Sequence, residues 1–401
     1  MFKFIHTSDW HLGQNFYGYD RSEEQSDFLH QLADIVRKHT PDALLVSGDI
    51  FHTAAPPNTA INLYVNGLLD IHKACPSMAI IVIAGNHDSA SRLDSDKRLW
   101  ELANVTVRGG ISRDKNGLAD LDNHIIKVGE KGIVAAVPFA YPTSFPLAAN
   151  AADIERGQRQ QAYFQALLDQ ANSGNTDCLP IVLMAHLTVS GGDFNGHERN
   201  MAIEGVDSDT LGSGYDYVAL GHIHRPQEVN TDVRIRYSGT PVPVSFDEQC
   251  EHSVSIVTID HHGALPAIET KVIKNIKPLH TIPAKPVDFD TALNQLQKLN
   301  PNERAYIRLN VMVDRYLPEG AQERAAQAVA DKQCRLCEIK KTSTAAIGNR
   351  PSQMTVEEFH SKEPIDIANQ YFIDTHGEPM NEQQREMFND IYQLVKEGNR
   401  T

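Results

Sequence analysis

Five hydrophobic segments of this chain each end in residues that bind metal ions, and this repetition limits the fold more than any other feature. Each segment has the length and composition of a buried β-strand. The segments read FIHTSDWH (4–11), LLVSGDIFH (44–52), IIVIAGNHD (80–88), IVLMAH (181–186) and YVALGHIH (217–224). Strand ends in an open α/β layer converge on one crevice, so these polar side chains can share a site. Glycines that let the chain turn sharply precede three of the polar groups, at Gly48, Gly85 and Gly221.

The side chains at these strand ends offer oxygen and nitrogen donors and no thiolate. They are Asp9, His11, Asp49, His52, Asn86, His87, Asp88, His186, His222 and His224. Such a mixed set suits Mn²⁺, Zn²⁺ or Fe²⁺ better than a structural zinc site. The donors exceed what one ion needs, and an aspartate can bridge two ions about 3.5–4 Å apart, the spacing used for phosphate displacement. A water that bridges the two ions would be the nucleophile, and a histidine not needed as a ligand would protonate or stabilise the leaving oxygen.

The hydrophobic periodicity predicts alternating strands and helices, followed by shorter strands. Strands are expected at 2–6, 43–47 and 79–84, and helices at about 22–38 and 58–73. After residue 100, shorter strands and turns favour a mixed two-sheet α/β core with helices across its faces.

The second half of the chain predicts a small α/β domain and a helical tail. The proline- and lysine-containing stretch near 275 is typical of a linker, and it precedes helices at 290–299 and 320–331 and strands at 305–313 and about 334–341. The strand at 305–313 alternates strictly, which predicts half-burial. The expected domains are therefore 1–275, 276–345 and 346–401.

The tail carries apolar residues at helical spacing from Ile365 to Val395. They either pack on the body of the protein or dock on the helices of another protein. Docking is favoured because two short amphipathic helices beyond a completed domain have little core of their own to fill.

Charge and composition exclude some classes of protein. The formal net charge of −15 argues against an unaided nucleic-acid clamp, but metals or a partner can supply positive charge to a DNA enzyme. The sequence contains no run of 18 or more apolar residues, so no membrane span is predicted. The first residues lack the features of an export signal. Five cysteines do not make a disulfide framework, so a reducing, cytoplasmic compartment is expected.

The order D-x-H, G-D, G-N-H-D, H and G-H-x-H resembles the signature of the calcineurin-like metallophosphoesterase superfamily. That resemblance implies a two-sheet α/β sandwich with a dinuclear metal centre that hydrolyses phosphoesters. One ion would be held by Asp9, His11, Asp49 and His224. The other would be held by Asp49, Asn86, His186 and His222, with Asp49 as the bridge. His87 would be the catalytic histidine, paired with Asp88.

The flanks HTSDWHLGQNFYGYDR (6–21), GNHDSASRL (85–93) and YSGTPVPVSFDE (237–248) resemble the family of nuclease subunits from the bacterial SbcCD complex. The resemblance covers at least residues 3–250. It implies an Mn²⁺-dependent nuclease for DNA ends and hairpins, with a capping domain and C-terminal helices that bind the coiled-coil base of the ATPase SbcC. It also implies two copies of each subunit, association with the nucleoid, and a homodimer through 58–73 and 92–102, where ordinary core packing is the alternative.

The sequence leaves the roles of several residues undecided and allows two functions other than a nuclease. His52 is close enough to the second motif to line the site, whereas His6 is expected to be a hydrogen-bonded core histidine. His197, Arg199 and Arg225 either meet a phosphate or remain exposed to solvent. The alternatives to a nuclease are a phosphatase or phosphodiesterase for a small molecule or phosphoprotein, and a metal-free scaffold that only binds proteins.

Overall fold

The computed structural model describes residues 1–147, 158–193, 205–343, 364–376 and 379–398. Contacts divide the chain into two compact units. The first contains Met1–Thr281, Asn300–Arg308 and Lys332–Glu338, and the second contains Ile282–Leu299, Leu309–Asp331 and Ile339–Thr401. Within the ranges that the structure describes, none of the helices combines the length and apolar character needed to cross a bilayer.

Two six-stranded mixed sheets form the core of the first unit. The first sheet has the order β14 (Ala267–Val272), β13 (Ser253–Ile259), β1 (Phe2–Thr7), β4 (Ala43–Ser47), β5 (Ala79–Ile83) and β6 (Val105–Arg108). The second has the order β11 (Gln227–Val229), β12 (Asp232–Tyr237), β10 (Tyr217–Gly221), β9 (Ile181–His186), β8 (Gly132–Val137) and β7 (Ile125–Val128). In each sheet the strands that carry the metal-ligand candidates run parallel to one another.

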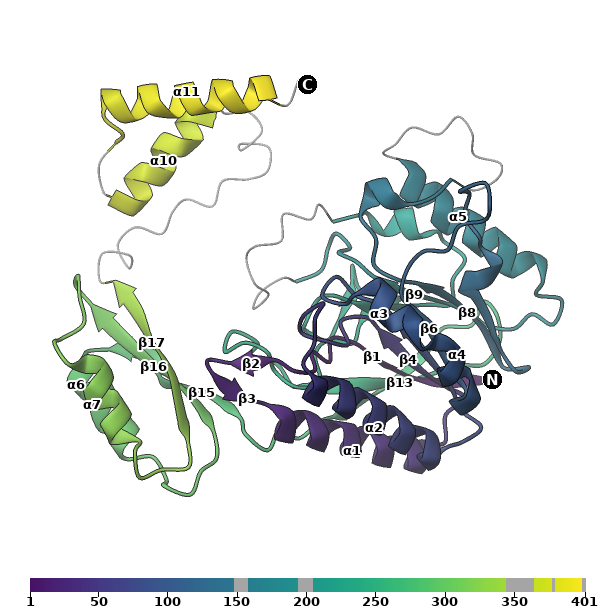
Figure 1. Ribbon diagram of the computed structural model, residues 1–401, viewed down its shortest axis with the longest axis horizontal. Coiled ribbons are helices and arrows are strands. Elements are labelled where there is room, and N and C mark those ends of the chain that lie inside the picture. Colours follow the sequence, from purple (N-terminus) through teal and green to yellow (C-terminus); the bar gives the residue numbers. More distant parts are fainter. Residues whose placement is uncertain (148–157, 194–204, 344–363, 377–378, 399–401) are drawn as a thin grey trace. The chain divides into compact units, whose positions relative to one another are not determined.

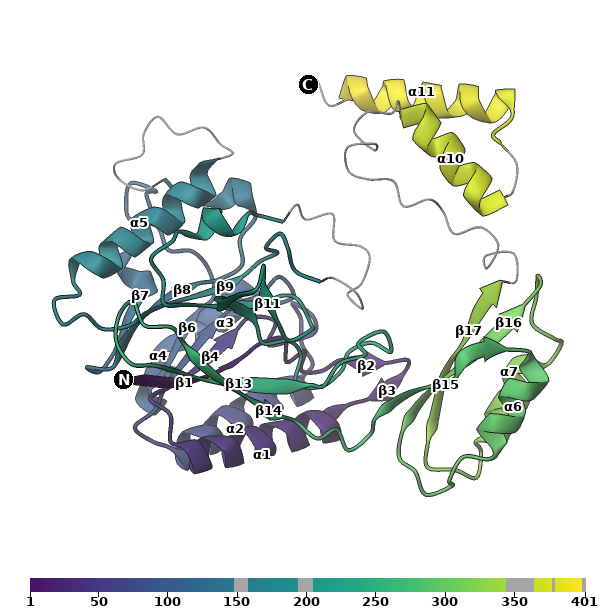
Figure 2. The same ribbon diagram turned by 180° about the vertical axis from the view of Figure 1, so that it is seen from behind.

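The two sheets pack face to face, and helices cover their outer faces (Figures 1 and 2). Buried side chains from both sheets meet in one cluster, with Phe4 and Leu45 on one side and Val182 and Met184 on the other. Helices α1 (Ser22–His39) and α2 (Asn58–Ala74) pack on the first sheet, and α5 (Arg159–Ser173) packs on the second. The expected two-sheet sandwich flanked by helices is therefore confirmed. The helices are needed because the strands are buried on both faces.

Short elements complete the first unit. The hairpin β2 (Asn15–Phe16) and β3 (Tyr19–Asp20) precedes α1, and two short helices, α3 (Ala90–Ser95) and α4 (Lys97–Trp100), follow β5. Single 3₁₀ turns are formed by Glu101–Ala103, Asp122–His124, Pro142–Ser144 and Ser208–Leu211.

The stretch after residue 275 is not the linker that its prolines predict. It contains β15 (Leu279–Val287), which lies at the edge of a three-stranded sheet with the order β15, β16 (Tyr306–Val313) and β17 (Arg335–Ser343). Pro283 and Pro286 are tolerated in β15 because an edge strand leaves one row of its backbone groups unpaired. Helices α6 (Phe289–Gln297) and α7 (Ala321–Ala328) pack against each other in the second unit.

The expected half-burial of β16 is wrong, since its polar face is also covered. Arg308 is buried, with its guanidinium carbon 5.1 Å from the centre of the Phe246 ring and Nη1 2.8 Å from Asp247 Oδ1. Asn310 is buried as well and donates to the Pro283 carbonyl oxygen over 3.3 Å. Alternation identified the strand, but it did not show that both faces are packed.

The tail forms the two expected helices, α10 (Pro364–His376) and α11 (Glu382–Gly398). The backbone N–H of Met380 donates to Asn369 Oδ1 over 2.9 Å and ties the connection to α10. Tyr371 and Met387 are exposed by 69% and 67%. Large apolar side chains of these helices therefore face solvent in the isolated chain.

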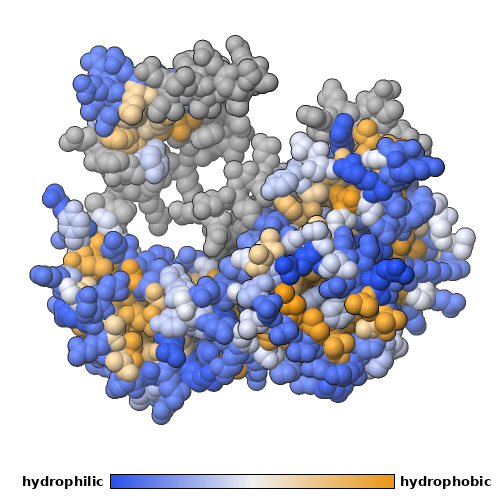
Figure 3. All heavy atoms as spheres, viewed as in Figure 1, coloured by the Kyte–Doolittle hydropathy of each residue, from blue (hydrophilic) through white to orange (hydrophobic). Residues whose placement is uncertain are grey.

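The region expected to form a dimer divides into core and surface residues. Tyr64, Leu68 and Leu93 are buried in the protein's own core, so their expected place in an interface is wrong. Leu99 and Leu102 are exposed by 68% and 87%. Hydrophobic residues also reach the surface on the face that carries α3 and α4 in Figure 3.

Candidate metal centre

The ends of five strands place the metal-ligand candidates at one edge of the two sheets. Asp9 and His11 follow β1, Asp49 follows β4, and the run 86–88 follows β5 in the first sheet. In the second sheet, His186 ends β9, while His222 and His224 follow β10. Contacts across the sheets join these residues, as expected from the sequence.

Four of the candidates form the first ligand group. His11 Nε2 lies 3.2 Å from His224 Nε2 and 3.9 Å from Asp49 Oδ2. Donor atoms of Asp9, His11 and His224 all lie within 4.8 Å of one another. The structure therefore brings together the four side chains that the family resemblance assigns to one ion.

The second ligand group shares Asp49 with the first. Asp49 Oδ2 lies 3.4 Å from His186 Nε2. The amide oxygen of Asn86 lies 3.0 Å from His186 Nε2 and 3.0 Å from His222 Nδ1. Since the carboxylate of Asp49 reaches ligands of both groups, it is the residue best placed to bridge two ions.

The donor atoms fit a pair of divalent cations. His11 and His224 point ring nitrogens at each other, and His11 Nδ1 is buried without a hydrogen-bond partner in the described part of the chain. Buried polar atoms normally have partners, so an unpartnered nitrogen on His11 indicates a ligand at this side chain. Carboxylate, amide and imidazole donors without thiolates suit Mn²⁺, Fe²⁺ or Zn²⁺.

The backbone at the site is held in an uncommon conformation. The φ angles of Asp9, His11, Asp49 and His222 are +53°, +45°, +51° and +100°. Positive φ is rare for residues with a side chain and persists where the surroundings impose it, often at functional sites. Here it turns each ligand out of its strand and into the crevice.

The glycines before the ligands act in two ways. Gly48 has a φ of +88°, as expected for a sharp turn. Gly85 and Gly221 do not have positive φ, so the expected turn is not their role. A Cβ on Gly85 would lie 2.1 Å from Asp49 Oδ1, and one on Gly221 would lie 1.9 Å from the Ser47 carbonyl oxygen. These two positions need glycine because the site leaves no room for a side chain.

A second layer of hydrogen bonds orients two of the histidines. His186 Nδ1 lies 2.8 Å from the Ser47 carbonyl oxygen, so it donates there and leaves Nε2 for a metal. His224 Nδ1 lies 2.9 Å from Oε1 of Glu248, which is buried. Glu248 Oε2 accepts from Thr240 Oγ1 over 2.9 Å and from the backbone N–H of Val244 over 3.2 Å.

Sequence reasoning missed Glu248. It is the last residue of the flank YSGTPVPVSFDE (237–248), which was used only for the family resemblance and gave Glu248 no role. Its place in that flank, shortly after the last metal-ligand candidates, was the signal that could have marked it.

His87 lies at the rim of the site, beside His11 and His52. The ring centres of His87 and His11 are 5.0 Å apart, and the rings of His87 and His52 stack at 5.8 Å. His87 Nδ1 lies 2.9 Å from the His52 carbonyl oxygen, and its backbone N–H donates to Asp49 Oδ1. A proton held at Nδ1 leaves Nε2 as the nitrogen available for proton transfer.

The expected pairing of His87 with Asp88 is replaced by other contacts. The Asp88 carboxylate accepts the backbone N–H groups of Gly85, Ile50 and Phe51 over 2.8, 3.1 and 2.9 Å. Asp88 therefore fixes the backbone that carries Asp49 and Asn86. The His52 carbonyl is the partner of the His87 ring.

Burial and charge set opposing pKa shifts within the site. Burial would raise the pKa of Asp49, but the neighbouring histidines His186 and His11 lower it. Burial would lower the pKa of His186, but the carboxylates of Asp49 and Asp9 raise it to about 9. Burial dominates at Asp9, whose pKa rises to about 6, and at His11, whose pKa falls well below its usual value.

The other residues singled out in the sequence lie apart from these contacts. His6 is buried in β1 and its Nδ1 lies 3.0 Å from Tyr217 Oη, which confirms a core histidine. Arg225 is half exposed and its Nη1 pairs with Asp193 Oδ2 at 2.5 Å. His197 and Arg199 lie outside the described residues.

The arrangement can support hydrolysis of a phosphoester. Two bound divalent ions would generate a metal-activated water and hold the phosphate oxygens. The chain contributes the shared carboxylate of Asp49, the oriented histidines and a rim histidine that can move a proton.

Comparisons with known proteins agree with the site. Residues 2–226 match the family model described as calcineurin-like phosphoesterase, and residues 275–376 match the model SbcD_C, described as type 5 capsule protein repressor C-terminal domain. The SbcD subunit of the SbcCD nuclease of Escherichia coli (strain K12) is 30% identical over 79% of this chain and 79% of its own. The corresponding protein of Rhodobacter capsulatus is 35% identical over 66% of this chain and 68% of its own. The corresponding protein of Bacillus subtilis (strain 168) is 32% identical over 64% of this chain and 66% of its own.

The phosphoesterase model covers more than half of the chain, on the strands that carry all the ligand candidates. The similarity to the relatives extends beyond this region. The chain therefore belongs to the calcineurin-like phosphoesterases and, within them, to the SbcD family.

Proposed function

We propose that this chain is an Mn²⁺-dependent DNA nuclease that hydrolyses phosphodiesters at double-strand ends and hairpins. The observation that carries the proposal is the pair of ligand groups joined at Asp49, whose Oδ2 lies 3.9 Å from His11 Nε2 and 3.4 Å from His186 Nε2. The names of the relatives, nuclease subunits of an SbcCD complex, support nucleic acid as the substrate.

Each residue has a proposed role. One ion is held by Asp9, His11, Asp49 and His224, and the other by Asp49, Asn86, His186 and His222. His87 is the catalytic histidine and protonates the leaving oxygen. Asp88 supports it through the backbone that both residues share, and His52 lines the site and holds the His87 ring through its carbonyl group.

The remainder of the chain serves assembly in this proposal. The strands and helices of 276–345 form a capping domain, and helices within 346–401 bind the coiled-coil base of the ATPase SbcC. Tyr371 and Met387 support the second assignment, because each is a large apolar side chain, about two-thirds exposed, on one of the two tail helices. SbcC would contribute to DNA binding, which reconciles DNA cleavage with a net charge of −15.

A homodimer through 58–73 and 92–102 completes the proposed assembly of two copies of each subunit. Leu99 and Leu102 are its apolar contacts, since both are largely exposed in the single chain. The assembly would act on the nucleoid in the cytoplasm.

The test is cleavage of an end-labelled DNA duplex by the purified chain with Mn²⁺, Mg²⁺ or EDTA. A phosphomonoester and a bis-aryl phosphodiester are assayed beside it. Cleavage of DNA with Mn²⁺ that EDTA stops is the expected result. Fast hydrolysis of the monoester with intact DNA would assign the chain to the phosphatases instead.

Assembly is tested separately by removing 346–401. The shortened chain should no longer bind SbcC in a pull-down, while hydrolysis of the bis-aryl phosphodiester continues. Capture of SbcC by the shortened chain would refute the docking role of the tail.

A further inference from the structure

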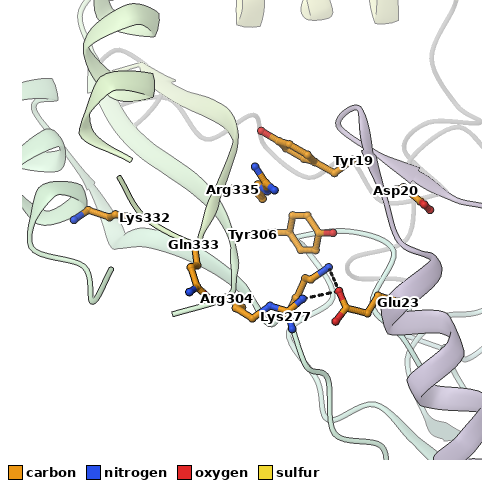
Figure 4. Close-up of a pocket in the computed structure, with 9 residues that line it drawn as sticks. All are labelled: Tyr19, Asp20, Glu23, Lys277, Arg304, Tyr306, Lys332, Gln333 and Arg335. Atoms are coloured by element: carbon orange, nitrogen blue, oxygen red, sulfur yellow. Dashed lines mark hydrogen bonds and ion pairs between the residues drawn. The ribbon is translucent and has the colours of Figure 1, made fainter. Parts of the chain in front are cut away.

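A polar pocket lies in the first unit, apart from the metal centre. It has a volume of about 550 Å³ and is lined by segments far apart in the sequence (Figure 4). Tyr19 and Glu23 come from β3 and α1, Lys277 and Arg304 flank β15 and β16, and Arg335 begins β17. None of the metal-ligand candidates lines it.

The pocket is positive in a chain that is strongly negative. Its charged side chains are the four cations Lys277, Arg304, Lys332 and Arg335 and the two carboxylates Asp20 and Glu23. The lining therefore carries a formal excess of two positive charges, against −15 for the whole chain. Behind it, Glu24 contacts both Arg21 and Lys277, so the pair Arg21 and Glu24 adds no net charge.

The two carboxylates are already engaged. Glu23 Oε2 lies 2.9 Å from Lys277 Nζ and 2.5 Å from Arg304 Nη2, as the dashed lines in Figure 4 show. Hydrogen bonds from Arg304 and Lys277 lower the pKa of Glu23 to about 2. Asp20 Oδ1 accepts the backbone N–H of Ser22 over 2.9 Å and the Ser22 hydroxyl over 2.6 Å.

Arg335 is the cation best placed to receive a ligand. Its guanidinium lies over the Tyr19 ring, 5.5 Å from the ring centre, and no carboxylate among the described residues pairs with it. Ring contact holds the planar guanidinium in place and leaves its N–H groups to bind an anion. Arginine binds phosphate through two parallel hydrogen bonds, so a phosphate suits this position.

We propose that this pocket binds the terminal phosphate of a nucleotide. A phosphate monoester carries close to two negative charges at neutral pH, which matches the excess charge of the lining. The volume falls in the usual range of small-ligand sites, about 300–1,000 Å³, and exceeds what a phosphate group alone would fill. The remaining space takes the attached nucleoside. This site goes beyond the proposed nuclease function and does not depend on it.

Such a nucleotide can be free in solution or can be the 5′ end of a strand. The test is equilibrium binding to the full chain, with and without EDTA, which prevents binding through metal ions. The probes are dAMP, deoxyadenosine, and a single-stranded 12-mer with a 5′-phosphate or a 5′-hydroxyl. A free-nucleotide site binds dAMP and does not distinguish the 12-mers, whereas a strand-end site prefers the phosphorylated 12-mer.

Two variants with opposite expected effects test the pocket. Lys332→Gln with Arg335→Gln should weaken binding of the preferred probe by about tenfold or more, since charge-assisted hydrogen bonds to phosphate are lost. Arg37→Gln with Lys38→Gln is the matched control, because it removes the same charge from the opposite end of α1. Glu23→Gln should tighten binding several-fold, because Lys277 and Arg304 lose their competing carboxylate.

The proposal is overturned if dAMP binds no better than deoxyadenosine and a 5′-phosphate gives the 12-mer no advantage. Equal weakening by the pocket and control variants would overturn it as well. No arm of the experiment measures cleavage, so its failure is separate from failure of the nuclease assignment. Thermal melting of each variant confirms that the compared proteins are folded.

Discussion

Removal of the Glu248 carboxylate should weaken metal binding although Glu248 is not itself a ligand candidate. Its Oε1 lies 2.9 Å from His224 Nδ1, and this contact aims the opposite nitrogen, Nε2, at His11. Loss of such a partner behind a metal-binding histidine typically costs roughly 10–100-fold in affinity. That corresponds to about 1.4–2.8 kcal/mol.

Glu248→Ala should show the larger loss in this range, because nothing replaces the hydrogen bond to His224. Glu248→Gln should lie near the tenfold end, since its amide oxygen can still accept from Nδ1. The amide cannot also satisfy the Val244 N–H, so both variants should lose stability, by about 1–3 kcal/mol for an unsatisfied buried donor. Thr240→Val is the matched control, since it removes a hydrogen bond to Oε2 and leaves the contact of Oε1 intact.

The assay is calorimetric titration of Mn²⁺, with Co²⁺ absorption as a spectroscopic measure of the geometry at His224. Thermal melting in EDTA measures the stability cost by itself. Wild-type metal affinity and an unchanged Co²⁺ spectrum in Glu248→Ala, with only a lower melting temperature, would refute the orienting role.

Three further predictions address the metal centre. His87→Ala should keep both metals by elemental analysis and lose about 10²–10⁴-fold in hydrolysis of a bis-aryl phosphodiester. Near-normal turnover by His87→Ala would refute a catalytic role for His87. Asp49→Ala should instead lose the metals themselves. Since His186 has a pKa raised to about 9, it holds a proton at neutral pH without metal. Metal binding should therefore release protons, and apparent affinity should rise up to about pH 9, as titrations in buffers of different ionisation enthalpy will show. Gly85→Ala should abolish metal binding, because the added Cβ would lie 2.1 Å from Asp49 Oδ1. Gly174→Ala is the control and should bind metal normally, because the space around Gly174 is open. Equal metal affinities of the two variants would contradict the steric argument.

The strand ends were predictable because two strong signals coincide there. Hydrophobic runs identify strands, and donor residues three positions after Val46 and Ile83 lie just beyond the ends of two of those strands. The contacts of Asn86 and Asp49 with histidines of the other sheet followed once the sheets were placed face to face. Local patterns were therefore enough to bring the candidate side chains to one crevice, whereas their division into two ligand groups came from the family resemblance.

Features that depend on tertiary contacts were not predictable from local patterns. Pro283 indicated a linker, but an edge strand tolerates it. Arg308 indicated a solvated strand face, but the Phe246 ring and the Asp247 carboxylate cover it. Glu248 reaches His224 from a loop, and the role of Asp88 depends on backbone N–H groups that no side-chain pattern shows.

The proposed ligands come from two sheets that no strand pairing joins within the described residues, and this has a mechanical consequence. Asp9, His11, Asp49 and Asn86 follow strands of the first sheet, whereas His186 ends a strand of the second and His222 and His224 follow another. Two metal ions bound by these residues would therefore cross-link the sheets at one end of the sandwich. Metal at about 100 times its dissociation constant would add about 2.7 kcal/mol per site to the free energy of unfolding. Removing the metals should therefore make this end of the sandwich easier to open than it is in the metal-bound protein.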